Sequence, residues 1–123
     1  MTVTIAFLDA LAEAFNRHDV DAVMSMMTED CVYLASVGDE TEGRRIVGRS
    51  AVRQAFADYF KTFPDARWNE PRHFIAGDRG CTEWCFTCTL QDGKKVNAAG
   101  CDLFHFRNGK VQLKSSMRKQ AAR

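Results

Sequence analysis

The chain has 123 residues, 46% of them hydrophobic, and its 17 Lys and Arg residues nearly balance its 16 Asp and Glu residues. This is the size of one domain that can bury about two thirds of its unfolded surface without a disulfide or a metal. The formal net charge of +1 excludes the basic surplus that binding along a nucleic acid requires. We therefore expect a single domain over residues 1–123 that has no nucleic-acid partner.

The N-terminal stretch has neither the basic start of a signal peptide nor the apolar run of a membrane span. Asp9 and Glu13 interrupt it too early for either. This pattern predicts a cytoplasmic protein with no membrane partner. Five cysteines leave an odd thiol in any pairing, and in a reducing compartment we expect all of them to be free. They are Cys31, Cys81, Cys85, Cys88 and Cys101.

Three helices are predicted in the first half of the chain. The first covers about residues 4–17, where apolar side chains recur at spacings of three and four. Asp19 is expected to cap the second, which ends at residues 28–30. Ser50 is expected to cap the third, and Pro64 stops it.

Strands dominate the rest of the sequence. A β-rich run at residues 31–34 follows the second helix, and the polar stretch at 36–48 is expected to be a loop or short hairpin. Turns at 78–80, 92–93 and 108–109 separate four more strands. These strands are predicted at 72–77, 81–90, 94–106 and 110–118. Helices followed by a meander of strands indicate an α+β domain with helices on one face of an antiparallel sheet.

Three strings of residues carry a family resemblance. They are AFNRHDVDAVMSMMTEDCVY, IVGRSAVRQAFADYF and GCDLFHFRNGKV. With the order helix, helix, strand, helix, meander, they resemble the SnoaL-like and nuclear transport factor 2-like superfamily, which includes polyketide cyclases and ketosteroid isomerases. The resemblance covers about residues 7–118. It implies a cone-shaped fold in which three N-terminal helices pack on a strongly curved antiparallel sheet that encloses one pocket.

The resemblance to ketosteroid isomerase carries over only in part. The aspartate of that enzyme's oxyanion hole falls on Asp102, whereas its general base falls on Ala35. Its pocket tyrosines fall on Leu11, Met27 and Phe56. Steroid-type proton transfer cannot run in the same way without the base, and the fold hosts many activities. We therefore do not expect that specific activity here.

The Asp92–Gly93 turn sets the register of the two strands that it joins. A symmetric two-residue turn places Glu83 directly opposite Asp102. Two carboxylates with Cβ atoms about 5 Å apart repel unless one keeps its proton or a cation lies between them. Gly100 and Ala98 then lie on the same face, where they leave room for a cavity rather than a filled core.

The Asn108–Gly109 turn allows two registers. A strict two-residue turn pairs Asp102 with Ser115, whereas a glycine bulge shifts the last strand by one residue. We favour the bulge, because the resemblance requires it and because the two carboxylates otherwise lack a counter-charge. The bulged register gives Asp102 three neighbours on its own face: Lys114, Ser116 and Arg118.

The same registers predict an outer sheet face too apolar to be left in water, and we expect a homodimer through it. The predicted interface comprises Trp84, Phe86, Leu103, Val111 and Leu113. No metal site is expected, because Cys85 and Cys88 lie three positions apart in a strand and so point to opposite faces.

The predicted site has a charged floor made by four residues: Asp102, Glu83, Lys114 and Arg118. Asp102 is expected to carry a proton while Lys114 sets its charge, although Asp102 as a structural ion-pair partner is an equally good interpretation. His73 is expected to face the ligand as an acid or base, and the alternative is that His73 has only a structural role. The residues expected to contact the ligand are Tyr33, Phe56, Trp68, His73, Phe104, Ser116 and Arg118.

These residues predict a protein that binds a small organic molecule. Cofactor-free acid/base catalysis of the isomerase, cyclase or dehydratase type is one interpretation. The alternative is a non-catalytic ligand-binding or dimeric assembly module of the same fold.

Overall fold

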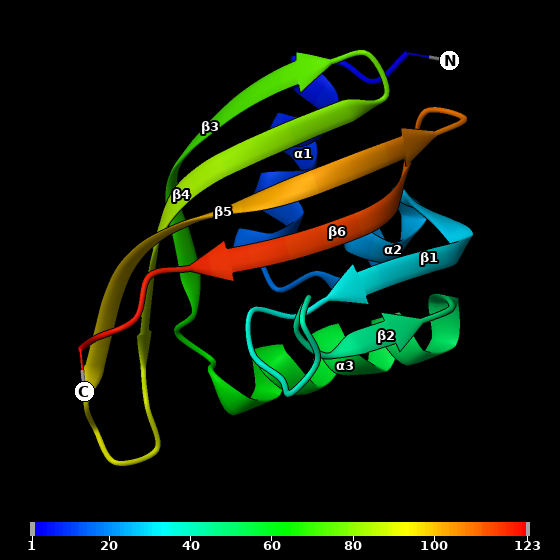
Figure 1. Ribbon diagram of the computed structural model, residues 1–123. Coiled ribbons are helices and arrows are strands. Elements are labelled where there is room, and N and C mark those ends of the chain that lie inside the picture. Colours follow the sequence, from blue (N-terminus) through cyan, green and yellow to red (C-terminus); the bar gives the residue numbers. More distant parts are fainter. Residues whose placement is uncertain (1, 123) are drawn as a thin grey trace.

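The computed structural model describes residues 2–122. Three helices, α1 (Ile5–Asn16), α2 (Val20–Ser25) and α3 (Arg49–Thr62), lie on one side of a curved, open sheet (Figure 1). Within the described residues the sheet has six strands in the order β2-β1-β6-β5-β4-β3. Their bounds are β1 (Met27–Leu34), β2 (Arg45–Val47), β3 (Arg67–Ala76), β4 (Arg79–Thr89), β5 (Lys95–Arg107) and β6 (Lys110–Arg118). The α+β architecture predicted from the sequence is confirmed.

The helix starts follow ordinary capping chemistry, with one difference from the prediction. The side chain of Asp19 accepts a hydrogen bond from the Ala22 amide at 3.0 Å, so Asp19 caps α2 as expected. Helix α3 begins two residues earlier than expected, directly after Gly48. The backbone of Gly48 has φ +93°, a conformation that glycine adopts without strain, and Ser50 therefore lies inside the helix.

Strand β1 is longer than predicted because it pairs with the last strand of the chain. Residues 28–30 belong to this strand rather than to the end of α2. Met27 lies beside Val111 and Tyr33 beside Lys114 in a parallel pairing, so the sheet is antiparallel except between β1 and β6. This pairing brings Tyr33 next to the residue that carries the buried charge of the site.

Helix α1 is fixed to β3 by hydrogen bonds as well as by packing. Asn16 Nδ2 donates to the Trp68 carbonyl at 2.9 Å, and the Trp68 amide donates to Asn16 Oδ1 at 2.8 Å. His18 Nε2 lies 2.7 Å from the Ala66 carbonyl, and its ring stacks on Phe60. The apolar face of α1 therefore lies at a defined position over the sheet, with Phe15 in the core.

Strand β3 bends at a bulge. Its pairing with β4 shifts between Asn69 and Arg72, and Glu70 has φ +52° just before Pro71. An extra residue in one strand increases the local bend and twist of a sheet. The bend directs Pro71 towards the space under α1, where it lines a cavity.

The β4–β5 hairpin has a different register from the predicted one. Its loop contains three residues, because the Leu90 amide donates to the Lys94 carbonyl at 2.8 Å and the Gly93 amide to the Leu90 carbonyl at 2.9 Å. Gly93 has φ +86°, as expected of the last residue of a three-residue hairpin loop. Thr82 therefore pairs with Asp102, and Glu83 pairs with Cys101.

This shift of one residue exchanges the two faces of β4. Trp84 and Phe86 lie inside the molecule, with 7% and 1% of their surface exposed, whereas Glu83 is exposed on the outer face. Trp84 pairs with Gly100, where an added Cβ would lie 2.5 Å from the indole ring. The room beside Gly100 that the sequence predicted is thus filled by Trp84.

The β5–β6 hairpin has the predicted pairing for a different reason. Asn108 and Gly109 both have positive φ, so the turn is a strict two-residue turn, with Arg107 opposite Lys110. The shift by one residue comes further along, between the pair formed by Phe106 and Val111 and the pair formed by His105 and Leu113. Lys114, Ser116 and Arg118 consequently share a face with Asp102, as predicted.

Candidate functional site

Asp102 lies at the centre of a buried polar cluster on the concave face of the sheet. Trp84 Nε1 donates to its Oδ2 at 2.9 Å, and Ser116 Oγ donates to its Oδ1 at 2.6 Å. Lys114 Nζ lies 3.1 Å from Oδ1 and also donates to Ser116 Oγ at 2.9 Å. Three donors from β4 and β6 therefore surround one carboxylate on β5.

Lys114 is a cation in an aromatic environment. Its Nζ lies 4.9 Å from the ring centroids of both Phe15 and Tyr33 and 5.6 Å from that of Phe56. Only 5% of the residue is exposed. An unpaired charge would be very costly here, but the Asp102 carboxylate and three ring faces offset the lost hydration. The ammonium group has three hydrogens and only two hydrogen-bonding or ion-pair partners among the described residues.

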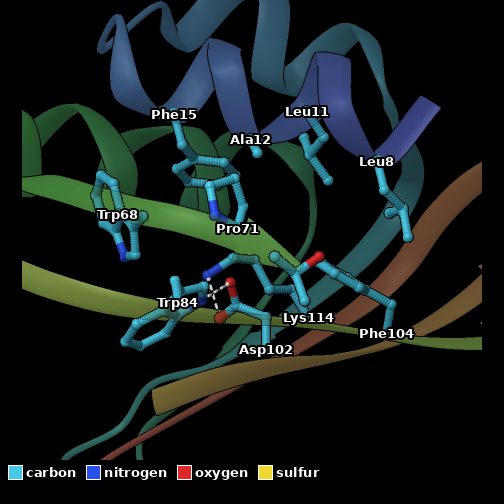
Figure 2. A pocket seen from close by; sticks show the side chains of 11 residues that line it. Leu8, Leu11, Ala12, Phe15, Trp68, Pro71, Trp84, Asp102, Phe104 and Lys114 are labelled. Atoms are coloured by element: carbon cyan, nitrogen blue, oxygen red, sulfur yellow. Dashed lines mark hydrogen bonds and ion pairs between the residues drawn. The ribbon is translucent and has the colours of Figure 1, made fainter. Parts of the chain in front are cut away.

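The residues of this cluster converge from two layers. In Figure 2, Leu8, Leu11, Ala12 and Phe15 extend down from α1, while Trp84, Asp102 and Lys114 lie on the strands below. Dashed lines join Asp102 to Trp84 and to Lys114. The site is therefore enclosed between α1 and the sheet.

Two small cavities meet at this cluster. The deep cavity, under α1, has a volume of about 20 Å³, and the inner cavity, towards α3, about 40 Å³. The residues that line both are Phe15, Trp68, Trp84 and Lys114. A volume of this size holds about one or two water-sized groups, so the cone interior is nearly filled.

A larger groove lies beyond the inner cavity. Tyr33, Ser36 and Tyr59 line both the inner cavity and this outer groove, which has a volume of about 490 Å³. The groove runs between α3 and the segment that precedes β2, and it includes Ala55 and Phe63. Its volume is within the range of small-molecule sites. The polar stretch at 36–48 borders this groove through Ser36, Val37 and Arg44.

Burial makes the phenol group of Tyr59 less acidic. Tyr59 lies between the inner cavity and the outer groove, and its ring packs against Trp68 and Phe86. Burial raises its pKa to about 12, although Arg118 acts in the opposite direction. Tyr59 therefore stays neutral well above neutral pH and offers a hydroxyl group rather than a phenolate.

Most of the predicted site residues lie around these cavities. Asp102 and Phe104 line the deep cavity, and Lys114 and Trp68 line both cavities. Of the two small cavities, only the inner one is lined by Tyr33, Phe56, Ser116 and Arg118.

Two predicted site residues lie elsewhere. Glu83 is exposed on the outer face and does not contribute to a charged floor, because the three-residue loop shifts β4 by one position. The His73 side chain is buried, but it lines neither cavity and is bonded to Asp9 and Thr82. The carboxylate pair predicted from the symmetric turn is therefore wrong, and a carboxylate–ammonium pair takes its place.

Three residues of the site were not predicted from the sequence. The sequence places Trp84 on the outer face, and it does not mark Thr82 or Phe15 as site residues. The pairing of a large aromatic residue with a glycine is a known device for filling the space above glycine in a sheet. The possibility of pairing Trp84 with Gly100 was therefore a sequence signal for the correct register of β4 and β5.

The predicted dimer interface requires a similar correction. Trp84, Phe86 and Val111 are buried inside the subunit, with at most 7% of their surface exposed. The outer face instead presents Leu103, which is 43% exposed, and Met117, which is 42% exposed, beside the half-buried Leu113. The face is apolar, but with a different set of side chains.

The cysteines are free thiols, and Cys85 and Cys88 point to opposite faces of β4, as predicted. Cys88 packs with Trp84 and Phe86, while Cys85 Sγ lies 2.8 Å from Asn97 Oδ1. Within residues 2–122, no three His, Cys, Asp or Glu side chains are grouped as a metal site. In the same part of the chain, no helix combines the length and apolar character needed to cross a bilayer.

The helices on a curved, open sheet and the pocket between them define a protein of the nuclear transport factor 2-like cone fold. The SnoaL-like domain profile matches residues 8–113. The chain belongs to the SnoaL-like family. No curated protein matches it.

Solved structures show the same fold at low sequence identity. A candidate polyketide cyclase from Xanthomonas campestris is 20% identical, covering 89% of this chain and 85% of its own, with a TM-score of 0.79. An NTF2-like protein of unknown function from Mesorhizobium loti is 26% identical, covering 92% and 88%, with a TM-score of 0.75. TerC, co-crystallised with polyporic acid, is 18% identical, covering 91% and 88%, with a TM-score of 0.76.

Proposed function

We propose that this protein binds a small organic molecule whose body lies in the outer groove and inner cavity and whose oxygen atom accepts a hydrogen bond from Lys114. The observation that carries the proposal is the buried ammonium of Lys114, which lies where the two cavities meet. A charge in so apolar a place is costly, and such groups concentrate at functional sites.

The lining of the inner cavity favours a flat ligand. Rings of Phe15, Tyr33, Phe56 and Trp68 line it, together with the polar side chains of Ser36, Lys114, Ser116 and Arg118. Aromatic walls with a few convergent polar groups are typical of sites for planar organic molecules. TerC, which shares this fold, was co-crystallised with polyporic acid, and this supports the proposal that the present protein binds an organic molecule.

The chemistry that we propose is cofactor-free proton transfer. Lys114 would stabilise negative charge that develops on a ligand oxygen, and Asp102, 3.1 Å from Lys114 Nζ, would carry the proton. Trp84 and Ser116 hold the carboxylate in one orientation through their hydrogen bonds. Isomerisation, cyclisation and dehydration of a carbonyl compound all need these two roles.

A second candidate function is ligand binding or assembly without turnover. Two observations favour it: Asp102 already accepts from Trp84, Ser116 and Lys114, and the cavities next to it total only tens of cubic ångströms. A carboxylate that is occupied by three donors is a poor base.

Fluorescence can test the binding proposal directly, because both tryptophans of the chain, Trp68 and Trp84, line the inner cavity. We expect acetophenone to change their emission saturably and Arg118→Met to weaken its binding. Lys119→Met, an exposed neighbour outside the cavities, is the matched control. Ligand binding in the cone would be contradicted if neither acetophenone nor any co-purified compound identified by native mass spectrometry changed the tryptophan emission.

Proton transfer is tested separately by measuring with NMR how fast the methyl hydrogens of acetophenone exchange for deuterium in D₂O. Faster exchange than in buffer, lost in Asp102→Asn with the fold intact, supports the enzyme. Saturable binding without exchange supports the second candidate.

We also propose that the protein is a cytoplasmic homodimer that associates through the outer sheet face around Leu103, Leu113 and Met117. The exposed apolar side chains support this surface.

A further inference from the structure

A chain of hydrogen bonds links the protein surface to the wall of the deep cavity. His73 Nε2 lies 2.8 Å from Asp9 Oδ1 on α1, and His73 Nδ1 lies 2.8 Å from Thr82 Oγ1 on β4. The Asp9 side chain is 61% exposed, whereas that of His73 is 3% exposed. Thr82 is 5% exposed and lines the deep cavity with Asp102 and Lys114. The three side chains thus connect solvent to the site already described.

For a neutral His73, the chemistry of the three groups fixes the direction of these hydrogen bonds. An ionised carboxylate can only accept, so His73 must donate from Nε2 to Asp9. The other nitrogen of a neutral imidazole is then an acceptor, and the Thr82 hydroxyl must donate to His73 Nδ1. The Thr82 hydroxyl hydrogen is consumed, and its oxygen has only lone pairs left for any other partner.

This direction determines what the deep cavity accepts. Its volume of about 20 Å³ holds about one water-sized group. Thr82 can receive a hydrogen bond from that group but cannot donate one to it. Lys114, on the wall of the same cavity, can only donate. Thr82 and Lys114 therefore demand opposite hydrogen-bonding groups.

We propose that Thr82 is a ligand contact held as a hydrogen-bond acceptor by Asp9 and His73, so that the site selects a carbonyl compound that also carries a hydroxyl or amino group. The carbonyl oxygen accepts from Lys114, and the hydroxyl or amino group enters the deep cavity and donates to Thr82. Asp9 and His73 are positioning residues, since neither lines the cavity. This inference rests on the proposed function, because it assumes that a ligand enters the cone.

The first test needs no ligand and measures the tautomer of His73. Two-bond ¹H–¹⁵N correlation spectra distinguish an imidazole protonated at Nε2 from one protonated at Nδ1. We expect the Nε2–H form at about pH 8. His73→Gln identifies the signal among the three histidines. A His73 protonated at Nδ1, alone or together with Nε2, would make Thr82 an acceptor from His73 and would overturn the proposal.

The second test compares two probes of nearly the same shape. In the wild-type protein, α-hydroxyacetophenone, whose added hydroxyl lies beside the carbonyl group and is small enough for the deep cavity, should bind about three- to tenfold more tightly than acetophenone, the effect of one added hydrogen bond. Thr82→Val should remove this preference, and Thr82→Ser, which keeps the hydroxyl, should restore it. A merely structural Thr82 would change stability but not the ratio of the two dissociation constants.

The outcomes separate this inference from the proposed function. If both probes bind with equal affinity in the wild type and in Thr82→Val, ligand binding stands and the role of Thr82 is wrong. This result is also expected if a water molecule alone occupies the deep cavity. If neither probe binds, the proposed function and this ligand class fail together, whatever tautomer His73 adopts.

Discussion

Lys114 Nζ lies 3.1 Å from Asp102 Oδ1, and at most a tenth of either side chain is exposed. Removal of one partner of such a pair leaves the other charge buried without compensation. We expect Lys114→Met to lower the free energy of unfolding by about 3–5 kcal/mol near neutral pH. Chemical denaturation measures this loss, and Lys110→Met, at an exposed position of the same strand, is the control.

The double variant Asp102→Asn, Lys114→Met separates the effect of the uncompensated buried charge on stability from the effect of lost packing. We expect it to be more stable than Lys114→Met alone, because no buried negative charge is left. Equal or lower stability of the double variant would contradict this account of the ion pair.

Gly100 provides the space for the indole of Trp84. A Cβ at this position would lie 2.5 Å from the ring and 2.4 Å from the Met117 carbonyl oxygen, and the backbone atom cannot move away easily. We predict that Gly100→Ala destabilises the protein by about 1–3 kcal/mol in a thermal or denaturant melt. Ala99→Val, at the exposed neighbouring position, should be nearly neutral.

Charge on the outer face should separate a dimer without unfolding the subunit. Leu103 is exposed, so Leu103→Glu should yield folded monomers in sedimentation experiments. Phe86→Glu should instead abolish folding, because Phe86 is 1% exposed within the subunit. A wild-type protein that sediments as a monomer at micromolar concentration would rule out the interface.

The buried phenol of Tyr59 should make stability fall at alkaline pH. Its pKa is raised from 10.0 to about 12 in the folded state, so the unfolded chain loses this proton first as the pH rises. The contribution is fully present below about pH 10 and is lost between about pH 10 and 12, by up to about 2 kcal/mol. Unfolding free energies measured across this range should fall less steeply in Tyr59→Phe.

Thiol reactivity should differ sharply between folded and unfolded protein. Burial and the neighbouring Cys101 raise the pKa of Cys81 to about 12, and Cys81 is only 4% exposed. Because the thiolate is the reactive form, Cys81 should react very slowly with a maleimide in the folded protein. Titration of the unfolded, unreduced protein should count five thiols, and a lower count would reveal a disulfide.

The sequence predicted the helices and most of the pocket because those features depend on local patterns. The spacing of apolar residues in α1 and the parity of β5 place Phe104 and Asp102 on one face without reference to the rest of the fold. The one-residue shift that brings Lys114 to the face of Asp102 is predicted from the family resemblance and from the missing counter-charge of the two carboxylates, although the bulge lies near Gln112 in β6 and not at the turn.

The register of β4 was mispredicted because one turn sequence permits two closures. Asp92 and Gly93 suit both a two-residue and a three-residue hairpin loop, and the choice moves every side chain of β4 to the opposite face. The three-residue loop buries Trp84 and Phe86 and exposes Glu83, which is more favourable than the reverse. A comparison of the two registers by burial would have selected it.

The link between His73 and Asp9 could not be predicted from spacing. The two residues lie 64 positions apart and meet because α1 crosses β3. That crossing depends on how Asn16 and Trp68 join the two elements, which is a tertiary contact without a local sequence signal.

The aromatic enclosure of Lys114 also shields its ion pair from dissolved ions. The rings of Phe15 and Tyr33 occupy the space that counterions would need, so the attraction between Lys114 and Asp102 should hardly change with ionic strength. Arg53 and Asp21, whose side chains are 45% and 82% exposed, form a surface pair that added salt should weaken. The protein therefore combines a salt-insensitive charge at the site with salt-sensitive charges around it. A ligand that binds at Lys114 should accordingly keep its affinity in concentrated salt, unlike an anion attracted to the molecular surface.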